Sequence, residues 1–161
     1  MTDTKGSSLY SLMRALLLVS LCLGLVACSK DSTSVEDYDA RSVTLPDGSL
    51  VKAEVMMNPT DMARGMMFRD KFPEGRGMLF IHGSEDNHRY FMYQVKIPLD
   101  MVWMDKNRRV VEMAENVPPC KTAKASECPT YGGERQSMFV LELPAGYGRK
   151  HGIREGTVLQ F

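Results

Sequence analysis

The sequence of 161 residues has no excess of either charge, because 20 Lys and Arg residues balance 20 Asp and Glu residues. Without a basic surplus, the chain has no electrostatic footprint for nucleic acid or anionic lipid. It has no G-x-S-x-G motif and no C-x-x-C motif, which leaves no marked nucleophile and no thioredoxin-like redox pair. Its main apolar run, residues 15–27, is too short for an ordinary membrane-spanning helix.

That apolar run has the features of a secretory signal peptide over residues 1–27, since Lys5 and Arg14 precede it and small residues end it. Its last residues, LVAC, resemble the lipobox of bacterial lipoproteins, in which the chain is cut before a cysteine that carries diacylglycerol. The resemblance implies that Cys28 is lipidated and acylated, and several acyl chains give a stable membrane anchor. The alternative is a plain signal peptide with an incidental cysteine.

The expected processed chain, residues 28–161, has 18 basic and 19 acidic residues once Lys5, Arg14 and Asp3 are removed. We expect it in the cell envelope, lipid-anchored to a membrane that faces the periplasm. Ser29 after the anchor resembles the residue found in lipoproteins passed to the outer membrane of diderm bacteria. Residues 28–40 are polar and are predicted to form a flexible tether, which leaves a single globular domain at 41–161.

Strand patterns dominate the predicted domain. Apolar residues on both faces of the first strand within Tyr90–Met113 predict a central hairpin that turns at residues 105–108. Further strands are expected on both sides of a turn at Pro46-Asp47-Gly48, and at residues 77–81, 137–143 and 157–161, with residues 82–89 as a polar loop. A short helix should start at Asn58-Pro59. We predict an α+β, strand-rich fold: a curved, mainly antiparallel sheet or small barrel with one or two short helices.

Five short motifs follow one another along the predicted domain: RGMMFR, GMLF, IPLD, PPC and LELPAG. In this order they resemble the family called domain of unknown function 192. The resemblance implies a compact, strand-rich domain, often exported in bacteria, and implies no activity. The chain departs from the family at residues 90–95, where YFMYQV replaces Phe-Trp-Met-Lys-Asn-Thr, and at Gly156-Thr157, where the family has Gly-Asp.

Two cysteines, Cys120 and Cys128, fall within the predicted domain. In an oxidising compartment they are expected to form a disulfide that staples an irregular loop. The alternative is a redox pair, although the spacing differs from C-x-x-C.

Methionine is abundant, and 11 of the 13 methionines lie after Cys28. Thioether sulfur suits Cu(I), so a copper site that combines methionines with His82 or His88 is one interpretation. The other is flexible core filling, which the strand and helix spacing of these residues favours. We therefore predict no metal and no cofactor.

Several charged residues interrupt apolar motifs and should find either one another or a ligand, because an unpaired buried charge is costly. With a neighbouring tryptophan they form the candidate ligand pocket: Arg64, Arg69, Asp100, Trp103 and Glu142. The structural alternative is a set of internal ion pairs.

Non-catalytic binding of a small ligand or of another envelope protein is the function that this sequence favours, with no nucleic-acid partner. One alternative is an envelope hydrolase that uses Asp100 or Glu142 with a histidine. A second alternative is a periplasmic Cu(I)-binding protein that uses the methionines and histidines.

Overall fold

The computed structural model describes residues 39–161. The predicted signal peptide, the predicted lipidation site Cys28 and most of the predicted tether lie outside the described residues. Within residues 39–161, no helix combines the length and the apolar character that crossing a membrane requires.

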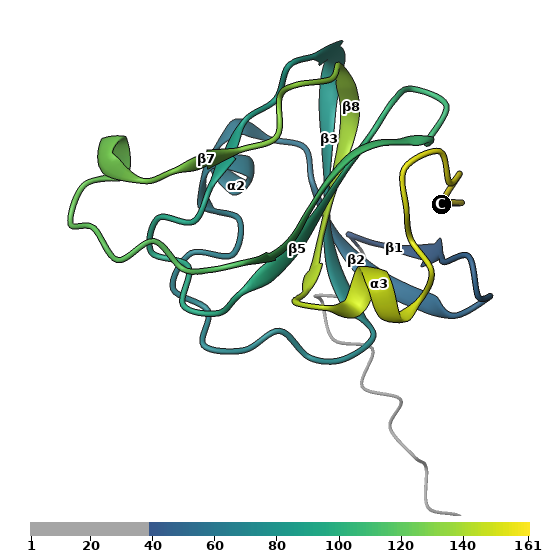
Figure 1. The fold of residues 1–161 in the computed structure, drawn as a ribbon, viewed down its shortest axis with the longest axis horizontal. Coiled ribbons are helices and arrows are strands. Elements are labelled where there is room, and N and C mark those ends of the chain that lie inside the picture. The colour runs from purple at the N-terminus through teal and green to yellow at the C-terminus, as the bar shows by residue number, and fades with distance from the viewer. Residues whose placement is uncertain (1–38) are drawn as a thin grey trace, which may run out of the picture. The chain divides into compact units, whose positions relative to one another are not determined.

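A curved sheet of six strands, in the order β1-β2-β3-β8-β5-β6, forms the body of the domain (Figure 1). The strands are β1 (Ala40–Thr44), β2 (Leu50–Met56), β3 (Arg76–Asp86), β5 (Leu99–Met104), β6 (Val110–Val117) and β8 (Ser137–Pro144). A separate pair joins β4 (Tyr90–Phe91) to β7 (Thr130–Tyr131). The helices are α2 (Pro59–Arg64), the 3-10 turn η2 (Ala125–Glu127) and α3 (Tyr147–Lys150).

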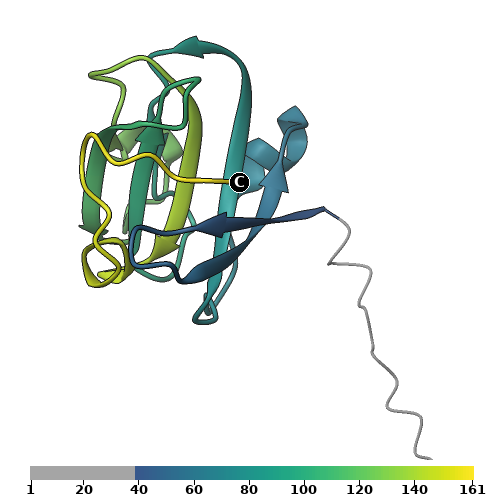
Figure 2. The ribbon, with the colours of Figure 1, turned by 90° about the vertical axis from the view of Figure 1, so that its right-hand side faces the viewer.

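The predicted fold class is confirmed, and the sheet is open rather than closed into a barrel. The segment 157–161 was predicted as a last strand, but it forms only two isolated bridges, Val158 with Arg109 and Gln160 with Thr44. Figure 2 shows this segment, in yellow, crossing the domain to the C-terminus. It therefore links the edge strand β1 to the turn before the opposite edge strand β6.

One pair of neighbouring strands, β2 and β3, is parallel, whereas the others are antiparallel. A parallel pair needs a crossover connection, and here the connection contains α2. The helix starts as its sequence predicts: the Asn58 side chain accepts a hydrogen bond of 2.9 Å from the Asp61 backbone N–H, and Pro59 occupies the first turn.

The predicted central position of the first hairpin strand is also confirmed, because β5 lies between β8 and β6 and all six of its residues are buried. Alternate residues of β5 point to opposite faces of the sheet. We call these the Trp103 face and the Val102 face. The Trp103 face packs a cluster that includes Met78, Phe80, Met101, Trp103 and Val140. The Val102 face packs a cluster that includes Leu79, Val102, Leu141, Leu143 and Tyr147.

Two boundaries around the central hairpin differ from the sequence prediction. The segment His82–Arg89 was expected to be a loop, but β3 continues to Asp86 because its pairing with β8 resumes after a register shift, so His82 lies on a strand. The hairpin strand begins at Leu99 rather than Tyr90, because Gln94 has a positive φ of 55° and interrupts extended backbone.

The predicted bond between Cys120 and Cys128 is present, with an S–S distance of 2.08 Å. The closed loop leads directly into β7, which pairs Tyr131 with Tyr90 of β4. The Cys120 backbone N–H also donates to the Met92 carbonyl at 3.2 Å. The disulfide therefore holds the loop against the β4 segment.

Replacing Cys120 and Cys128 together by serine should lower the free energy of unfolding by about 2–3 kcal/mol, because a short closed loop restricts the unfolded chain. Urea denaturation measures this loss. The amides of β4 should exchange faster with solvent in the variant. A reducing agent should affect the wild-type chain but not the double serine variant. Unchanged exchange at Tyr90 and Phe91 would show that the disulfide does not support β4.

Candidate functional site

A pocket of about 270 Å³ lies where residues of α2, β3, β4 and β8 come together. We call it the Glu142 pocket. Its walls are largely apolar and consist of methionine and aromatic side chains: Met62, Met66, Met67, Phe80, Tyr90 and Phe91. Its polar side chains are fewer: Arg64, His82, Arg89 and Glu142. A small apolar pocket with a few polar groups is the usual form of a site for a small molecule.

The most unusual group in this pocket is the carboxyl of Glu142. Glu142 pairs with Met101 across β8 and β5, so it points to the Trp103 face, and its residue is only 5% exposed. Its Oε2 atom is buried and has no hydrogen-bond partner among the described residues. Burial raises the pKa of Glu142 to about 8, and the nearby Arg69 acts in the opposite direction. At neutral pH the carboxyl is therefore mostly protonated.

Beside this carboxyl lies a small group of hydrogen-bonded and stacked rings. The hydroxyl of Tyr90 and Nε2 of His82 are 3.1 Å apart, and the ring of His82 stacks on His88 with a centroid distance of 3.4 Å. Burial, followed by the charge of His88, lowers the pKa of His82 to about 4. Burial and then Glu142 raise the pKa of Tyr90. Both side chains are therefore neutral at physiological pH.

Two exposed arginines, Arg64 and Arg89, line the same pocket. Within residues 39–161, the side chain of Arg64 makes no hydrogen bond or ion pair. Arg89 lies 3.9 Å from Glu134, and both side chains are more than half exposed, so solvent weakens this pair. Both guanidinium groups can turn toward an anion in the pocket.

The backbone next to the pocket is strained at two positions. Phe68 and Gln94 have positive φ angles of 66° and 55°, and the Phe68 N–H donates to the Gln94 carbonyl at 2.9 Å. These residues adjoin Met67 and Val95, which line the pocket. Such conformations cost on the order of 1–3 kcal/mol each and are enriched at functional sites. The hydrogen bond between Phe68 and Gln94 joins two parts of the pocket wall.

Of the five candidate pocket residues, the structure brings Arg64 and Glu142 together in this pocket. Arg69 lies nearby, but both of its terminal nitrogens are 2.8 Å from the carboxylate oxygens of Glu54. Trp103 is fully buried beneath the pocket wall. Its Nε1 donates to the His88 carbonyl at 2.9 Å, and its ring packs edge to face against that of Tyr90. Trp103 therefore supports the ring group without lining the pocket.

The fifth candidate, Asp100, lies on the opposite face of the sheet, because it pairs with Leu143 of the Val102 face. It is fully buried and accepts three backbone hydrogen bonds. Its Oδ1 accepts from Asn116 at 2.8 Å and from Gly146 at 3.0 Å, and its Oδ2 accepts from Gly148 at 2.9 Å. Asp100 thus ties the end of β6 to the turn between β8 and α3.

Sequence reasoning missed part of the pocket wall, including Arg89, Tyr90 and Phe91, and considered His82 only as a copper ligand. One signal was available, since the segment 90–95 is where the chain departs from the family pattern. Three of its residues, Tyr90, Phe91 and Val95, line the pocket. Val95 stands where the family has threonine, so this chain presents a more apolar wall there. Arg89 carried no signal, because the pattern predicted a polar loop.

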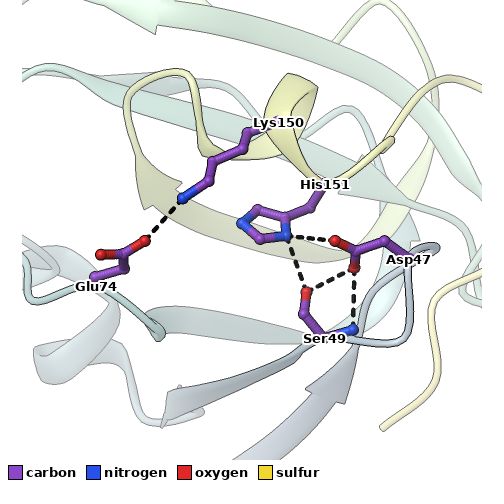
Figure 3. Close-up of polar contacts among 5 residues, drawn as sticks. All are labelled: Asp47, Ser49, Glu74, Lys150 and His151. Atoms are coloured by element: carbon purple, nitrogen blue, oxygen red, sulfur yellow. Dashed lines mark hydrogen bonds and ion pairs between the residues drawn. The ribbon is translucent and has the colours of Figure 1, made fainter.

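A second polar cluster joins the turn between β1 and β2 to α3, and it resembles a Ser-His-Asp triad only in composition (Figure 3). Nδ1 of His151 lies 2.7 Å from Oδ2 of Asp47 and 3.0 Å from the hydroxyl of Ser49. In a catalytic triad the serine and the carboxylate meet opposite ring nitrogens. Here both meet Nδ1, and Nε2 is buried without a partner among the described residues. The cluster, with the Lys150–Glu74 ion pair, is a structural contact.

This contact should make stability sensitive to acid. Hydrogen bonds from Ser49, followed by the bond with His151, lower the pKa of Asp47 to about 2. A carboxyl with a lowered folded-state pKa stabilises the fold above its unfolded pKa of about 4, and the contribution disappears as pH falls to about 2. Asp47→Asn should therefore reduce the melting temperature at neutral pH but not at pH 2. An equal reduction at both pH values would contradict this account.

Metal-binding groups are sparse in the part of the chain that the structure describes. There, no cluster of three or more His, Cys, Asp or Glu residues could hold a metal ion. The methionines are dispersed. Met78, Met92, Met101 and Met104 are buried in the core, and Met57 is exposed. Met62, Met66 and Met67 line the Glu142 pocket together with His82, and Met66 is also buried.

Comparison with known proteins identifies the family. Residues 42–161 match the family model DUF192, described as an uncharacterized ACR, and the chain therefore belongs to this family. No curated protein matches the chain.

Two solved structures are similar. A protein of unknown function from Novosphingobium aromaticivorans is 25% identical, with a TM-score of 0.68, over 76% of this chain and 85% of that chain. A protein from Sinorhizobium meliloti, described only provisionally as a transcription regulator, is 24% identical, with a TM-score of 0.63, over 74% and 89%. The second likeness shows the fold alone.

The motifs that carry the family resemblance separate into two structural groups. Asp100 of IPLD binds the backbone of Gly146 in LELPAG, which makes these two motifs a structural joint. Arg64 and Met66 of RGMMFR line the same pocket as Glu142 of LELPAG. The family pattern therefore contributes both to the stability of the fold and to the Glu142 pocket.

Proposed function

We propose that this chain is a membrane-anchored envelope protein whose domain binds a small ligand in the Glu142 pocket without catalysing a reaction. The observation that carries the proposal is the buried carboxyl of Glu142, whose Oε2 atom has no hydrogen-bond partner among the described residues. Buried polar groups are almost always hydrogen-bonded, and each exception calls for an explanation. A ligand that bonds to this carboxyl explains it.

An internal ion pair does not explain Glu142 equally well. Arg69 is the charged neighbour that acts on its pKa, but the guanidinium of Arg69 is engaged with Glu54. Arg64 lines the same pocket and is exposed, and among the described residues its side chain makes no bond to Glu142. A structural carboxyl resembles Asp100, both oxygens of which accept from backbone N–H groups, whereas Oε2 of Glu142 has no donor among the described residues.

The absence of catalysis in this proposal rests on how the candidate groups are separated. Asp100 and Glu142 lie on opposite faces of the sheet. Both carboxylate oxygens of Asp100 accept hydrogen bonds from backbone N–H groups. His82 is hydrogen-bonded to Tyr90 rather than to a carboxylate. A general base needs a reachable partner and a reacting group, and this arrangement supplies neither.

Membrane anchoring is supported by the sequence of residues 1–28, with its apolar run and the lipobox-like ending at Cys28. Cys28→Ser should abolish the incorporation of labelled palmitate and release the chain from the membrane fraction. Cys22→Ser is the matched control, because Cys22 lies inside the predicted signal peptide and its loss should change neither result. Palmitate incorporation into the Cys28→Ser chain would refute lipidation at this residue.

Native mass spectrometry on the full chain, purified as cells produce it, tests ligand binding. Wild-type protein is expected to retain an additional mass, and Glu142→Leu is expected to lose it. Glu155→Leu, which changes an exposed glutamate outside the pocket, should retain it. A bare wild-type chain, or a mass retained equally by Glu142→Leu, would contradict the proposal.

A second candidate function, Cu(I) binding, is favoured by one observation: Met62, Met66 and Met67 line the same pocket as His82. Soft thioether sulfur with neutral imidazole is a suitable ligand set for Cu(I). The same spectra separate the two functions. A retained mass of one copper ion that disappears in Met66→Leu would support copper, whereas an organic mass would exclude this candidate.

A further inference from the structure

We infer that the ligand of the Glu142 pocket is a small organic acid with a flat apolar body and a hydroxyl or carbonyl group at the end opposite its acid group. This inference rests on the proposed function and specifies its ligand class. Three features of the pocket carry it: the two arginines, the aromatic walls and the buried carboxyl.

The charge of the pocket selects an anion. At neutral pH, Arg64 and Arg89 are the ionised side chains that line it, because Glu142 is mostly protonated and His82 is neutral. The side chain of Arg64 has no partner among the described residues, and that of Arg89 has one distant, exposed partner. Guanidinium groups bind carboxylates with paired hydrogen bonds, and a ligand cation would be repelled by both arginines.

The walls and the volume of the pocket select a small, flat body. The rings of Phe80, Tyr90 and Phe91 line it together with methionine side chains. Phe80 and Tyr90 meet edge to face, with ring centroids 5.1 Å apart. A volume of about 270 Å³ lies just below the usual range of about 300–1,000 Å³ for ligand sites, so the ligand must be small. One aromatic ring with a short substituent at each end suits this space.

The buried carboxyl of Glu142 indicates that the inner end of the ligand carries a polar group. The arginines are exposed, whereas Glu142 is buried, so the two polar regions lie at different depths of the same pocket. A protonated carboxyl can donate to a ligand oxygen and can accept from a ligand hydroxyl. A ligand with a single polar end would leave either the arginines or Glu142 without a partner.

Isothermal titration calorimetry on the full chain with three matched probes tests this class. 4-Hydroxyphenylacetate has both polar ends, phenylacetate lacks the hydroxyl, and tyramine replaces the acid by an amine. We expect 4-hydroxyphenylacetate to bind at least about tenfold more tightly than either of the others, which corresponds to about 1.4 kcal/mol. If tyramine binds as tightly, the inference that the ligand is an anion is wrong. If phenylacetate binds as tightly, the inference that the ligand has a polar group at its inner end is wrong.

Two variants assign the ends of the ligand to residues. Arg64→Gln should weaken 4-hydroxyphenylacetate about tenfold and should strengthen tyramine, because it removes one of the two charges that repel a cation. Glu142→Leu should remove the preference for 4-hydroxyphenylacetate over phenylacetate, whereas Glu142→Gln, which keeps a donor and an acceptor, should preserve it. Thermal melting checks that each variant is folded. If Arg64→Gln has no effect on the acid, the anion is not bound as inferred.

The inference and the proposed function fail in different ways. If none of the three probes binds but the wild-type chain retains an organic mass that Glu142→Leu loses, the ligand class is wrong and the proposed function stands. If none binds and no mass is retained, both are wrong.

Discussion

Asp100→Ala is expected to lower the free energy of unfolding by at least about 3 kcal/mol, because three backbone N–H groups lose a buried acceptor at once. The cost of each unsatisfied donor is about 1–3 kcal/mol. These donors belong to Asn116, Gly146 and Gly148, so the variant should loosen the joint between β6 and α3. Denaturant unfolding measures the loss, and hydrogen exchange locates it.

Asp100→Asn is the matched control. Its amide oxygen can replace Oδ1, which accepts from Asn116 and Gly146, but its NH₂ group would face the N–H of Gly148. We therefore expect a smaller loss of unfolding free energy than in the alanine variant. Faster hydrogen exchange should be confined to α3. Equal stability of wild type and Asp100→Ala would show that this carboxylate is not a structural joint, and would reopen its role in a site.

Glu142 is expected to make the protein less stable as pH rises. The pKa of Glu142 is raised from 4.5 in the unfolded chain to about 8 in the fold, so the folded state binds its proton more tightly. A raised carboxyl pKa stabilises the fold fully below pH 4.5, and this contribution is lost as pH increases to about 8. One proton contributes a slope of at most about 1.4 kcal/mol per pH unit.

His82 acts in the opposite direction over part of this range, because its pKa is lowered to about 4 from 6.5. Wild type must therefore be compared with Glu142→Gln, which does not titrate at this position. The difference in free energy of unfolding between the two should change steadily between pH 6.5 and 8, where His82 no longer contributes. Parallel pH profiles for the two chains would contradict the burial of an ionisable, unpartnered carboxyl at Glu142.

Patterns in the sequence correctly predicted those strands and the helix start that depend only on residues close together in the chain. Apolar residues on both faces of β5, the capping side chain of Asn58 and the alternation within β8 each correspond to the observed element. The extension of β3 through His82 was not predictable, because it depends on pairing with β8, which is distant in sequence. The prediction of a strand at 157–161 was wrong for a related reason, because strand pairing depends on distant residues and this segment forms only two isolated bridges.

The candidate site was only partly predictable. Asp100 and Glu142 look alike in the sequence, as acidic residues within apolar strands, and the face of the sheet and the available backbone donors give them different roles. Those donors come from turns that no local pattern specifies. Arg64 and Arg69 also look alike in the sequence. In the structure, Arg69 binds the carboxylate of Glu54 on β2, whereas Arg64 lines the pocket.

The titration of the Glu142 carboxyl tests the central claim most directly, because the claim requires a buried carboxyl that a ligand can partner. Carbon-13 labelling of glutamate gives this signal, and Glu142→Gln assigns it. We predict a midpoint near pH 8 in the free protein and a clear displacement of that midpoint when a ligand binds. A midpoint near the ordinary value of 4.5 that no ligand displaces would contradict the account.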